Sequence, residues 1–309
     1  MKFGIHNPSF LFGSDPYEMF DQLKRKAQWA EEHGFVWFSL MDHLIQIPGV
    51  GAPGEPFMEG WTGLAALAAV TNKIRLATLV TSVAYRNPAL VAKMAAGIDI
   101  LSHGRLTLGI GAGWHKAEYD QYGYVFPDKP AIRIAQLAEA VRLIKTMWRE
   151  ERATFHGKYF HIENAILEPK PLQKPHPPIM IGGSGEQLTL RVVAREGDMT
   201  NLFGDPETVK NKLDILKKHC EEVGRDYNQI ERTNLISFLL ARNEQALKEK
   251  RERFGVGENA RLIASTPTQA VDLVGKYKDV GVQMAICSVF KNDQESLEIL
   301  AADIMPKFV

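Results

Sequence analysis

The feature that most constrains the fold of this chain is a repeated alternation between short apolar segments and longer segments with helical periodicity. The apolar segments predict eight strands, at residues 2–7, 36–42, 74–83, 105–110, 178–181, 199–203, 230–241 and 282–289. Strands that alternate with helices form a parallel sheet, because each helix carries the chain back to the same end of the sheet. Eight such units over 309 residues predict an α/β fold, a (β/α)8 or TIM barrel with insertion loops.

The main alternative is a doubly wound open sheet. That fold would need fewer strands at this length, and it would carry a glycine fingerprint in its first strand–helix turn. The corresponding turn, residues 7–12, contains no glycine. No internal repeat or low-complexity segment indicates a second domain, so we expect residues 1–309 to form a single barrel domain.

Three segments interrupt the alternation. Residues 44–60 hold four glycines and three prolines and predict a long loop, which in a compact domain is usually functional or mobile. Residues 154–161 alternate β-forming side chains around Gly157 and predict a small surface hairpin. Residues 169–178 contain five prolines and predict an extended connector.

Charge and composition exclude several classes of protein. The 37 basic and 37 acidic residues give a formal net charge of +0 with no basic stripe, so a nucleic acid is not an expected partner. The longest purely apolar run, residues 64–70, is too short to cross a membrane. Cys220 and Cys287 lie far apart in the sequence and form no disulfide framework, which fits a reducing, cytoplasmic location.

Asp42 and His43 are the strongest catalytic candidates from the residues alone. They lie at the carboxyl end of the second predicted strand and precede the long Gly/Pro loop. In a parallel barrel the carboxyl ends of the strands face the ligand, and a histidine there can exchange a proton near neutral pH. The alternative is a structural histidine beneath a loop, and the position leaves the two interpretations evenly balanced.

Two glycine-rich segments follow predicted strands. Gly109-Ile110-Gly111-Ala112-Gly113 lacks the third glycine of a dinucleotide fingerprint, because position 114 is Trp114. Its missing side chains would let a flat ligand approach, although tight packing explains them equally well. Gly182-Gly183-Ser184-Gly185 precedes a helix predicted at residues 186–195, where free amides and the helix dipole favour an anion. An ordinary turn is the alternative there.

Metal and nucleophile motifs are missing from the sequence. The nine histidines show no metal-binding spacing, no H-E-x-x-H motif occurs, and the two cysteines are too far apart in the sequence to form a metal-binding pair. A catalytic or structural zinc ion is therefore not expected. The nucleophile elbow G-x-S-x-G is also absent from the sequence.

The chain resembles the bacterial-luciferase-like oxidoreductases, and within them the branch that uses the deazaflavin coenzyme F420. The resemblance extends over nearly the whole chain and rests on an ordered set of short motifs. These are Met41-Asp42-His43, Thr78-Leu79-Val80-Thr81, Tyr85-Arg86-Asn87-Pro88, Gly104-Arg105-Leu106, Gly109-Ile110-Gly111-Ala112-Gly113-Trp114 and Pro177-Pro178-Ile179-Met180-Ile181-Gly182-Gly183-Ser184-Gly185.

The resemblance implies a cytoplasmic homodimeric enzyme that holds F420, or alternatively FMN, at the carboxyl end of its barrel and acts on a small molecule. A non-proline cis peptide at Leu79–Val80 would brace the ring, and Asp42 would hold the polar ring edge beside a catalytic His43. The other cofactor contacts that the resemblance implies are Thr81, Gly109, Gly111, Ala112, Gly182, Gly183 and Ser184, the last three at the phosphate.

One position departs from the family pattern. The sugar-phosphate dehydrogenase of this branch carries a glutamate proton donor just after the glycine strand, where this chain has Trp114. Glucose 6-phosphate is therefore a doubtful substrate, and a more apolar one is plausible. Two other functions stay open: an FMNH2- and oxygen-dependent monooxygenase on the same fold, and a non-catalytic flavin-binding protein.

Overall fold

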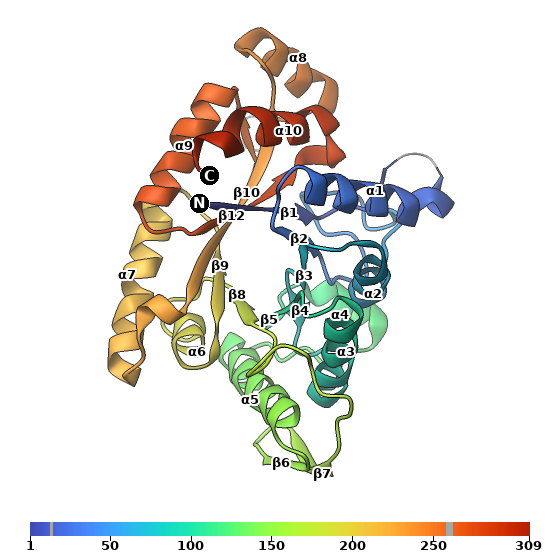
Figure 1. Cartoon of the computed structure of the whole chain (residues 1–309), viewed down its shortest axis with the longest axis vertical. Helices are drawn as coiled ribbons and strands as arrows, with labels where there is room; N and C mark the ends of the chain where they lie inside the picture. Colours follow the sequence, from blue (N-terminus) through green and yellow to red (C-terminus); the bar gives the residue numbers. More distant parts are fainter. Residues whose placement is uncertain (13–14, 258–261) are drawn as a thin grey trace.

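A closed barrel of eight parallel strands forms the centre of the computed structural model, which describes residues 1–12, 15–257 and 262–309 (Figure 1). Its strands are β1 (Lys2–Asn7), β2 (Trp37–Leu40), β3 (Arg75–Thr78), β5 (Leu106–Gly111), β8 (Ile179–Gly182), β9 (Met199–Leu202), β10 (Glu231–Leu240) and β12 (Met284–Val289). Neighbours pair in that order, and the ring closes where β10 pairs with both β9 and β12 and β12 pairs with β1. The expected (β/α)8 fold is confirmed.

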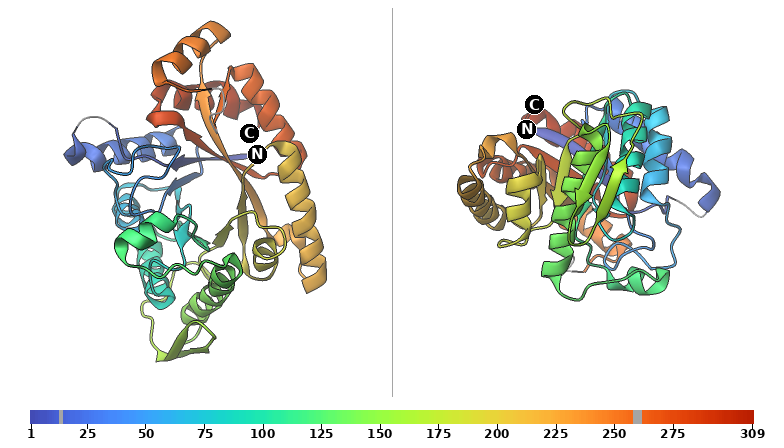
Figure 2. Two further views of the ribbon diagram at one scale, coloured as in Figure 1. Left: turned by 180° about the vertical axis from the view of Figure 1, so that it is seen from behind. Right: turned by 90° about the horizontal axis from the view of Figure 1, so that it is seen from below.

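Helices surround the barrel and connect its strands (Figures 1 and 2). They are α1 (Met19–Glu32), α2 (Gly60–Val70), α3 (Pro88–Leu101), α4 (Lys116–Tyr122), α5 (Pro130–Arg149), α6 (Thr189–Glu196), α7 (Pro206–Val223), α8 (Glu244–Phe254), α9 (Pro267–Asp279) and α10 (Gln294–Ile299). Several begin at a polar capping residue followed by proline, as at Asn87 and Asp205. The side chains of these two residues accept hydrogen bonds from backbone N–H groups in the first turn of the helix. No helix in the described residues is both long and apolar enough to cross a bilayer.

The interior of the barrel changes character along its axis. Near its amino end it is filled by an apolar cluster that includes Trp37, Met199 and Ile286. Side chains two residues further along a strand point to the same side, so polar groups follow toward the carboxyl end. Three hydrogen-bonded pairs lie there: His6–Ser39, Asn201–Thr233 and Ser237–Ser288. The polar end of the interior is therefore the end at which the strand–helix loops gather.

The structure corrects the sequence predictions in several places. The strand predicted at residues 74–83 is divided into β3 and the short β4 (Thr81–Ser82), with a cis peptide at Leu79–Val80 as the resemblance implied. The helix predicted at residues 186–195 begins only at Thr189, because the chain first makes a turn in which the Leu190 N–H donates to the Gly185 carbonyl. Helix α4 and the short strand β11 (Ile263–Ser265) were not predicted.

The predicted hairpin is confirmed as the antiparallel pair β6 (Ala153–His156) and β7 (His161–Ala165), inserted between α5 and β8. It lies at one end of the long axis of the molecule, and α8 lies at the other (Figures 1 and 2). The proline-rich connector then leads from β7 to β8, and it contains two cis prolines, Pro169 and Pro175.

Candidate active site

The loops that follow β2, β4 and β5 place charged side chains against one another at the carboxyl end of the barrel. Because β2 pairs with β3 and β4 pairs with β5, the ends of these strands are neighbours. Asp42 and His43 come from the β2 loop, Thr81 and Arg86 from β4 and the segment after it, and Glu118 from α4. Two ion pairs connect these groups, one at Asp42 and one at His43.

The first pair joins Asp42 and Arg86. The guanidinium donates to both carboxylate oxygens, at 2.7 and 3.0 Å, and the Thr81 hydroxyl donates to the same carboxylate. Arg86 also pairs with Glu59 at the start of α2. Burial raises the pKa of the Asp42 carboxyl, although Arg86 and Thr81 oppose that effect. Asp42 therefore holds the part-buried Arg86 side chain in place. The predicted contact of Asp42 with a cofactor ring would be a second role.

The second pair joins His43 and Glu118. The His43 Nδ1 atom lies 2.7 Å from Glu118 Oε2, and the glutamate side chain is fully buried. The same carboxylate accepts the backbone N–H groups of Leu44 and Ile45, at 2.6 and 3.1 Å, and the Tyr85 hydroxyl. Burial favours the neutral acid, but these hydrogen bonds outweigh it and lower the pKa of Glu118.

Glu118 is a site residue that the sequence analysis missed, because helix α4 was not predicted. A local signal exists, since Lys116 and Asp120 form an i,i+4 ion pair and Gly123 ends the helix in a left-handed conformation. An ionised carboxylate can only accept hydrogen bonds, so the Nδ1 atom of His43 is the donor. This contact fixes the tautomer of His43 and leaves its Nε2 atom available for a proton.

Two aromatic residues flank His43. The rings of Trp114 and His115 lie 5.8 and 6.1 Å from the His43 ring, and both meet it edge to face. The Trp114 side chain is 58% exposed at the end of the glycine-rich segment after β5. Its indole presents an apolar surface next to the imidazole.

A second histidine lies inside the barrel on β1. The Nδ1 atom of the buried His6 ring is hydrogen-bonded to the Ser39 hydroxyl, and the two atoms lie 3.0 Å apart. Burial, together with the nearby charges of Lys26 and His43, lowers the pKa of His6 to about 3. His6 is therefore neutral at physiological pH.

Val80 explains the glycines on the neighbouring strands. A Cβ atom added at either Gly111 or Gly182 would lie 2.8 Å from Val80 Cγ2, and one added at Gly109 would collide with the Thr78 carbonyl. These glycines make room for the segment between β3 and β4, on which Leu79 and Val80 are partly buried. The structure thus brings Leu79, Val80 and the three glycines together, and tight packing accounts for glycine at each of these positions.

The turn after β8 has some properties of an anion site. The backbone N–H groups of Ser184 and Gly185 donate to no acceptor in the described part of the chain. The Lys212 ammonium, from α7, donates to the Ser184 carbonyl at 3.0 Å and also pairs with the Glu186 carboxylate at 3.2 Å, so its positive charge at the turn is shared with an acid. Gly183 has φ +120°, a backbone conformation that residues other than glycine rarely adopt. Ala112 follows Gly111 at the end of β5 and packs half-buried against the core.

Comparison with known proteins identifies the family of the chain. Residues 1–285 match the profile of the luciferase-like monooxygenases. An uncharacterized protein of Mycobacterium tuberculosis is 32% identical, over 84% of this chain and 93% of its own length. An F420-dependent glucose-6-phosphate dehydrogenase of Kineococcus radiotolerans is 32% identical, over 91% and 90%, and an FMNH2-dependent dimethylsulfone monooxygenase of Pseudomonas putida is 26% identical, over 93% and 87%.

Solved structures of similar fold cover the whole chain. The coenzyme F420-dependent tetrahydromethanopterin reductase of Methanopyrus kandleri superposes with a TM-score of 0.81 at 19% identity, over 100% of this chain and 99% of that one. A monooxygenase of Streptomyces bottropensis, RslO1, superposes with a TM-score of 0.82 at 21% identity, over 100% of both chains. At these identities the superpositions concern the fold.

Proposed function

Because this chain belongs to the luciferase-like monooxygenase family, we propose that it is an oxidoreductase that transfers a hydride between coenzyme F420 and a small organic substrate. The observation that carries the proposal is the His43–Glu118 pair at the carboxyl end of the barrel, next to the Asp42–Arg86 pair. F420, when bound, supplies the ring carbon that carries the hydride. The protein must then hold the substrate and move a proton to or from its oxygen.

In the proposed reaction His43 exchanges this proton through Nε2. The Glu118 carboxylate accepts a hydrogen bond from Nδ1 and stabilises the imidazolium that forms when His43 takes up a proton. The carboxylate is held by two backbone amides and by Tyr85, so the imidazole is already oriented before the substrate binds. Asp42 and Arg86 place a buried pair of opposite charges beside the histidine, suited to a polar ring edge.

The cofactor position is supported by the surface around it. Leu79 and Val80 offer partly buried apolar side chains on which a flat ring could rest. The N–H groups of Ser184 and Gly185, beside Lys212, would receive the phosphate of the cofactor. Trp114 replaces an acidic residue with an apolar surface near His43, so we propose a substrate less polar than a sugar phosphate.

The choice of F420 rests on the relative that matches at 32% identity over 91% of the chain. A second function, an FMNH2-dependent monooxygenase, is favoured by the relative that matches at 26% over 93%. The two differ in their reaction with oxygen, because deazaflavin has carbon in place of the reactive ring nitrogen. Oxygen consumption by the protein with each reduced cofactor therefore separates them.

The test begins with the absorbance and mass of the cofactor that the purified protein binds. Enones, aldehydes and secondary alcohols are then screened with reduced or oxidised F420, and hydride transfer is followed in the visible band of the cofactor. Turnover with F420 and no oxygen uptake is the expected result. If turnover occurs only with FMNH2 and oxygen, the protein is a monooxygenase instead. If a cofactor binds but no substrate is turned over, the protein is a non-catalytic flavin-binding protein.

The phosphate contact is tested at Ser184 rather than at Gly183, because the positive φ of Gly183 would strain any side chain there. Ser184→Asp places a negative charge at the turn and should weaken F420 binding at least tenfold, about 1.4 kcal/mol. Ser184→Ala is the matched control and should bind as the parent does. Equal binding by both variants would place the phosphate elsewhere.

A further inference from the structure

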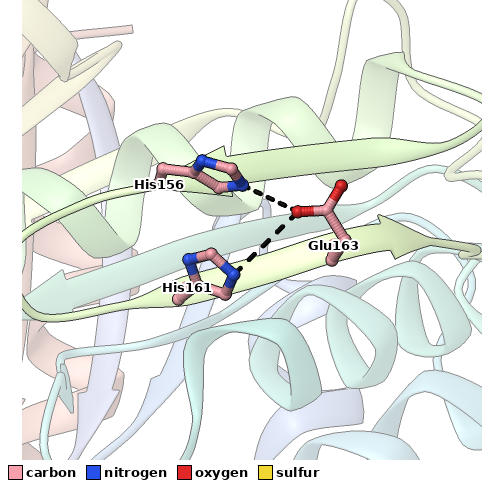
Figure 3. Close-up of side chains that lie close together, drawn as sticks. All are labelled: His156, His161 and Glu163. Atoms are coloured by element: carbon pink, nitrogen blue, oxygen red, sulfur yellow. Dashed lines mark hydrogen bonds and ion pairs between the residues drawn. The ribbon is translucent and has the colours of Figure 1, made fainter.

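We propose that the exposed face of the β6–β7 hairpin binds a divalent transition-metal ion through His156, His161 and Glu163 (Figure 3). This site is separate from the proposed active site, because the hairpin is an insertion at the periphery of the barrel (Figure 1). Zn²⁺ is the ion whose ligand preferences match it best, and Ni²⁺, Cu²⁺ and Co²⁺ are chemically related alternatives.

The register of the hairpin brings the three ligands to one face. His156 on β6 is directly opposite His161 on β7, and Glu163 is two residues beyond His161 on the same face of the strand. Figure 3 shows the two imidazoles side by side, with the carboxylate pointing toward both. The ring centroids lie 4.3 Å apart with an interplanar angle of 20°.

The distances between the donor atoms suit a single ion. His156 Nε2 lies 2.7 Å from Glu163 Oε2, and His161 Nε2 lies 3.9 Å from the same oxygen. All three donor atoms lie within 4.8 Å of one another. Ligands about 2.0–2.1 Å from a tetrahedral Zn²⁺ are roughly 3.3 Å apart, a value that lies between the two observed distances. Small side-chain rotations therefore convert the cluster into a coordination set.

Contacts with helix α5 and with the hydrophobic core hold the backbone of the hairpin in place. The buried carboxylate of Glu139, on α5, accepts the N–H groups of Lys158 and Tyr159, at 2.9 and 2.8 Å. A Cβ atom on Gly157 would collide with that carboxylate, which explains glycine at this turn. Phe155 and Ile162 pack against the hydrophobic core. A rigid hairpin loses little conformational freedom when an ion binds, which favours binding.

Chemistry of the donors distinguishes a metal site from an ordinary surface ion pair. An exposed histidine–glutamate pair contributes little to stability, and it needs only one histidine. Here the same carboxylate oxygen faces two imidazoles. Two nitrogen donors exclude a preference for Mg²⁺ or Ca²⁺, which bind oxygen ligands. With three protein ligands the fourth position of a tetrahedral ion is open to water.

The sequence alone does not predict this site, because its ligand spacing differs from the spacings found on helices and in zinc motifs. His156, His161 and Glu163 follow the pattern H-x4-H-x-E, which is meaningful only when the intervening residues form a hairpin turn. The cross-strand pairing supplies the proximity that the spacing does not reveal.

The experiment is a titration of tag-free, chelator-treated protein with Zn²⁺ in an isothermal calorimeter. One equivalent should bind to the parent protein. His161→Ala and Glu163→Gln should each weaken binding at least tenfold, while circular dichroism shows that both variants keep the parent fold. Co²⁺ should give the visible absorption of a four-coordinate ion in the parent and lose it in both variants.

His103→Asn is the matched control, because it removes an exposed histidine outside the hairpin at a position with φ 54°, which asparagine tolerates. This control should bind Zn²⁺ as the parent does. Unchanged Zn²⁺ affinity in both hairpin variants, or an equal loss in His103→Asn, would overturn the proposal. Hydride transfer by the hairpin variants should match the parent, so this test does not depend on the proposed function.

Discussion

Two histidine–glutamate pairs in this protein have the same contact distance and opposite surroundings. His43 and Glu118 meet at 2.7 Å, with side chains 14% and 0% exposed, and His156 and Glu163 also meet at 2.7 Å, with side chains 60% and 57% exposed. The distance alone therefore does not distinguish the two pairs. Their other contacts and their access to water do.

The buried carboxylate has no freedom to turn. Besides His43, it accepts hydrogen bonds from two backbone amides and from Tyr85, so its orientation is set by the loop after β2. The exposed carboxylate of Glu163 faces two histidines, the Asn164 side-chain amide at 3.5 Å and solvent, and its side chain can rotate at little cost. The buried His43–Glu118 pair is therefore suited to holding one imidazole in a fixed orientation, whereas the exposed His156–Glu163 pair can rearrange around an ion.

The largest expected effect is on turnover. His43→Ala should lower the rate of hydride transfer about 10²–10⁴-fold, because a positioned acid or base typically supplies that factor. Binding of F420 should stay within a few fold of the parent value. His156→Ala, which removes the histidine of the exposed pair, is the control and should leave the rate unchanged. Parent-like rates in His43→Ala would move the proton-transfer assignment to the residues around Trp114 and His115.

A smaller effect is expected on stability at the neighbouring ion pair. Asp42→Ala leaves the Arg86 guanidinium largely buried without its bidentate partner, which should cost about 3–5 kcal/mol. Urea denaturation at pH 7 measures this loss, and F420 titration of the folded protein should show weaker binding. A double variant that also replaces Arg86 with Met should recover much of the stability. A single variant as stable as the parent would contradict the structural role given to Asp42.

Glu118→Gln should destabilise the protein by about 1–3 kcal/mol at pH 7, because the amide replaces a carboxylate that accepts several donors. The folded-state pKa of Glu118 is lowered, so its contribution to stability is complete above the ordinary glutamate value, about 4.3. It is lost as the pH falls through the folded-state pKa. Denaturation curves at several pH values should show the gap between parent and variant narrowing below pH 4.3, and a constant gap would refute the ionised state.

The smallest effect is expected at the exposed pair. In metal-free buffer, Glu163→Gln should unfold at the same denaturant concentration as the parent within experimental error, since both partners are solvated. This result, set beside Glu118→Gln, would isolate the contribution of burial to two contacts of equal length. A loss as large as that of Glu118→Gln would show that the hairpin pair is structural and would remove the basis of the comparison.

Local patterns were sufficient to predict the barrel. Apolar runs for strands, and polar caps followed by proline for helices, act within a few residues and appear directly in the sequence. They failed where the decisive contact is distant. Residues 115–129 are mostly polar and aromatic, a composition that does not predict a helix, yet Lys116–Tyr122 forms one and its Glu118 is held by the loop after β2.

The candidate site was predictable only to the extent that it follows strand ends. Asp42 and His43 could be identified because they end the second predicted strand. Their partners Arg86 and Glu118 lie 44 and 75 residues further along the chain, and their pairing depends on the closed barrel. The hairpin ligands required a strand register, which the sequence did not specify. Three-dimensional proximity is the part that residue spacing could not supply.

The packing of Val80 over Gly111 and Gly182 has a consequence for how this barrel can evolve. Because the Val80 side chain occupies the space that a Cβ atom would need at either glycine, the three positions are not free to vary independently. Alanine at Gly111 would be harmful beside valine but tolerable once residue 80 had become smaller. Substitutions here should therefore be epistatic, and only those orders of mutation in which residue 80 becomes smaller first should be tolerated.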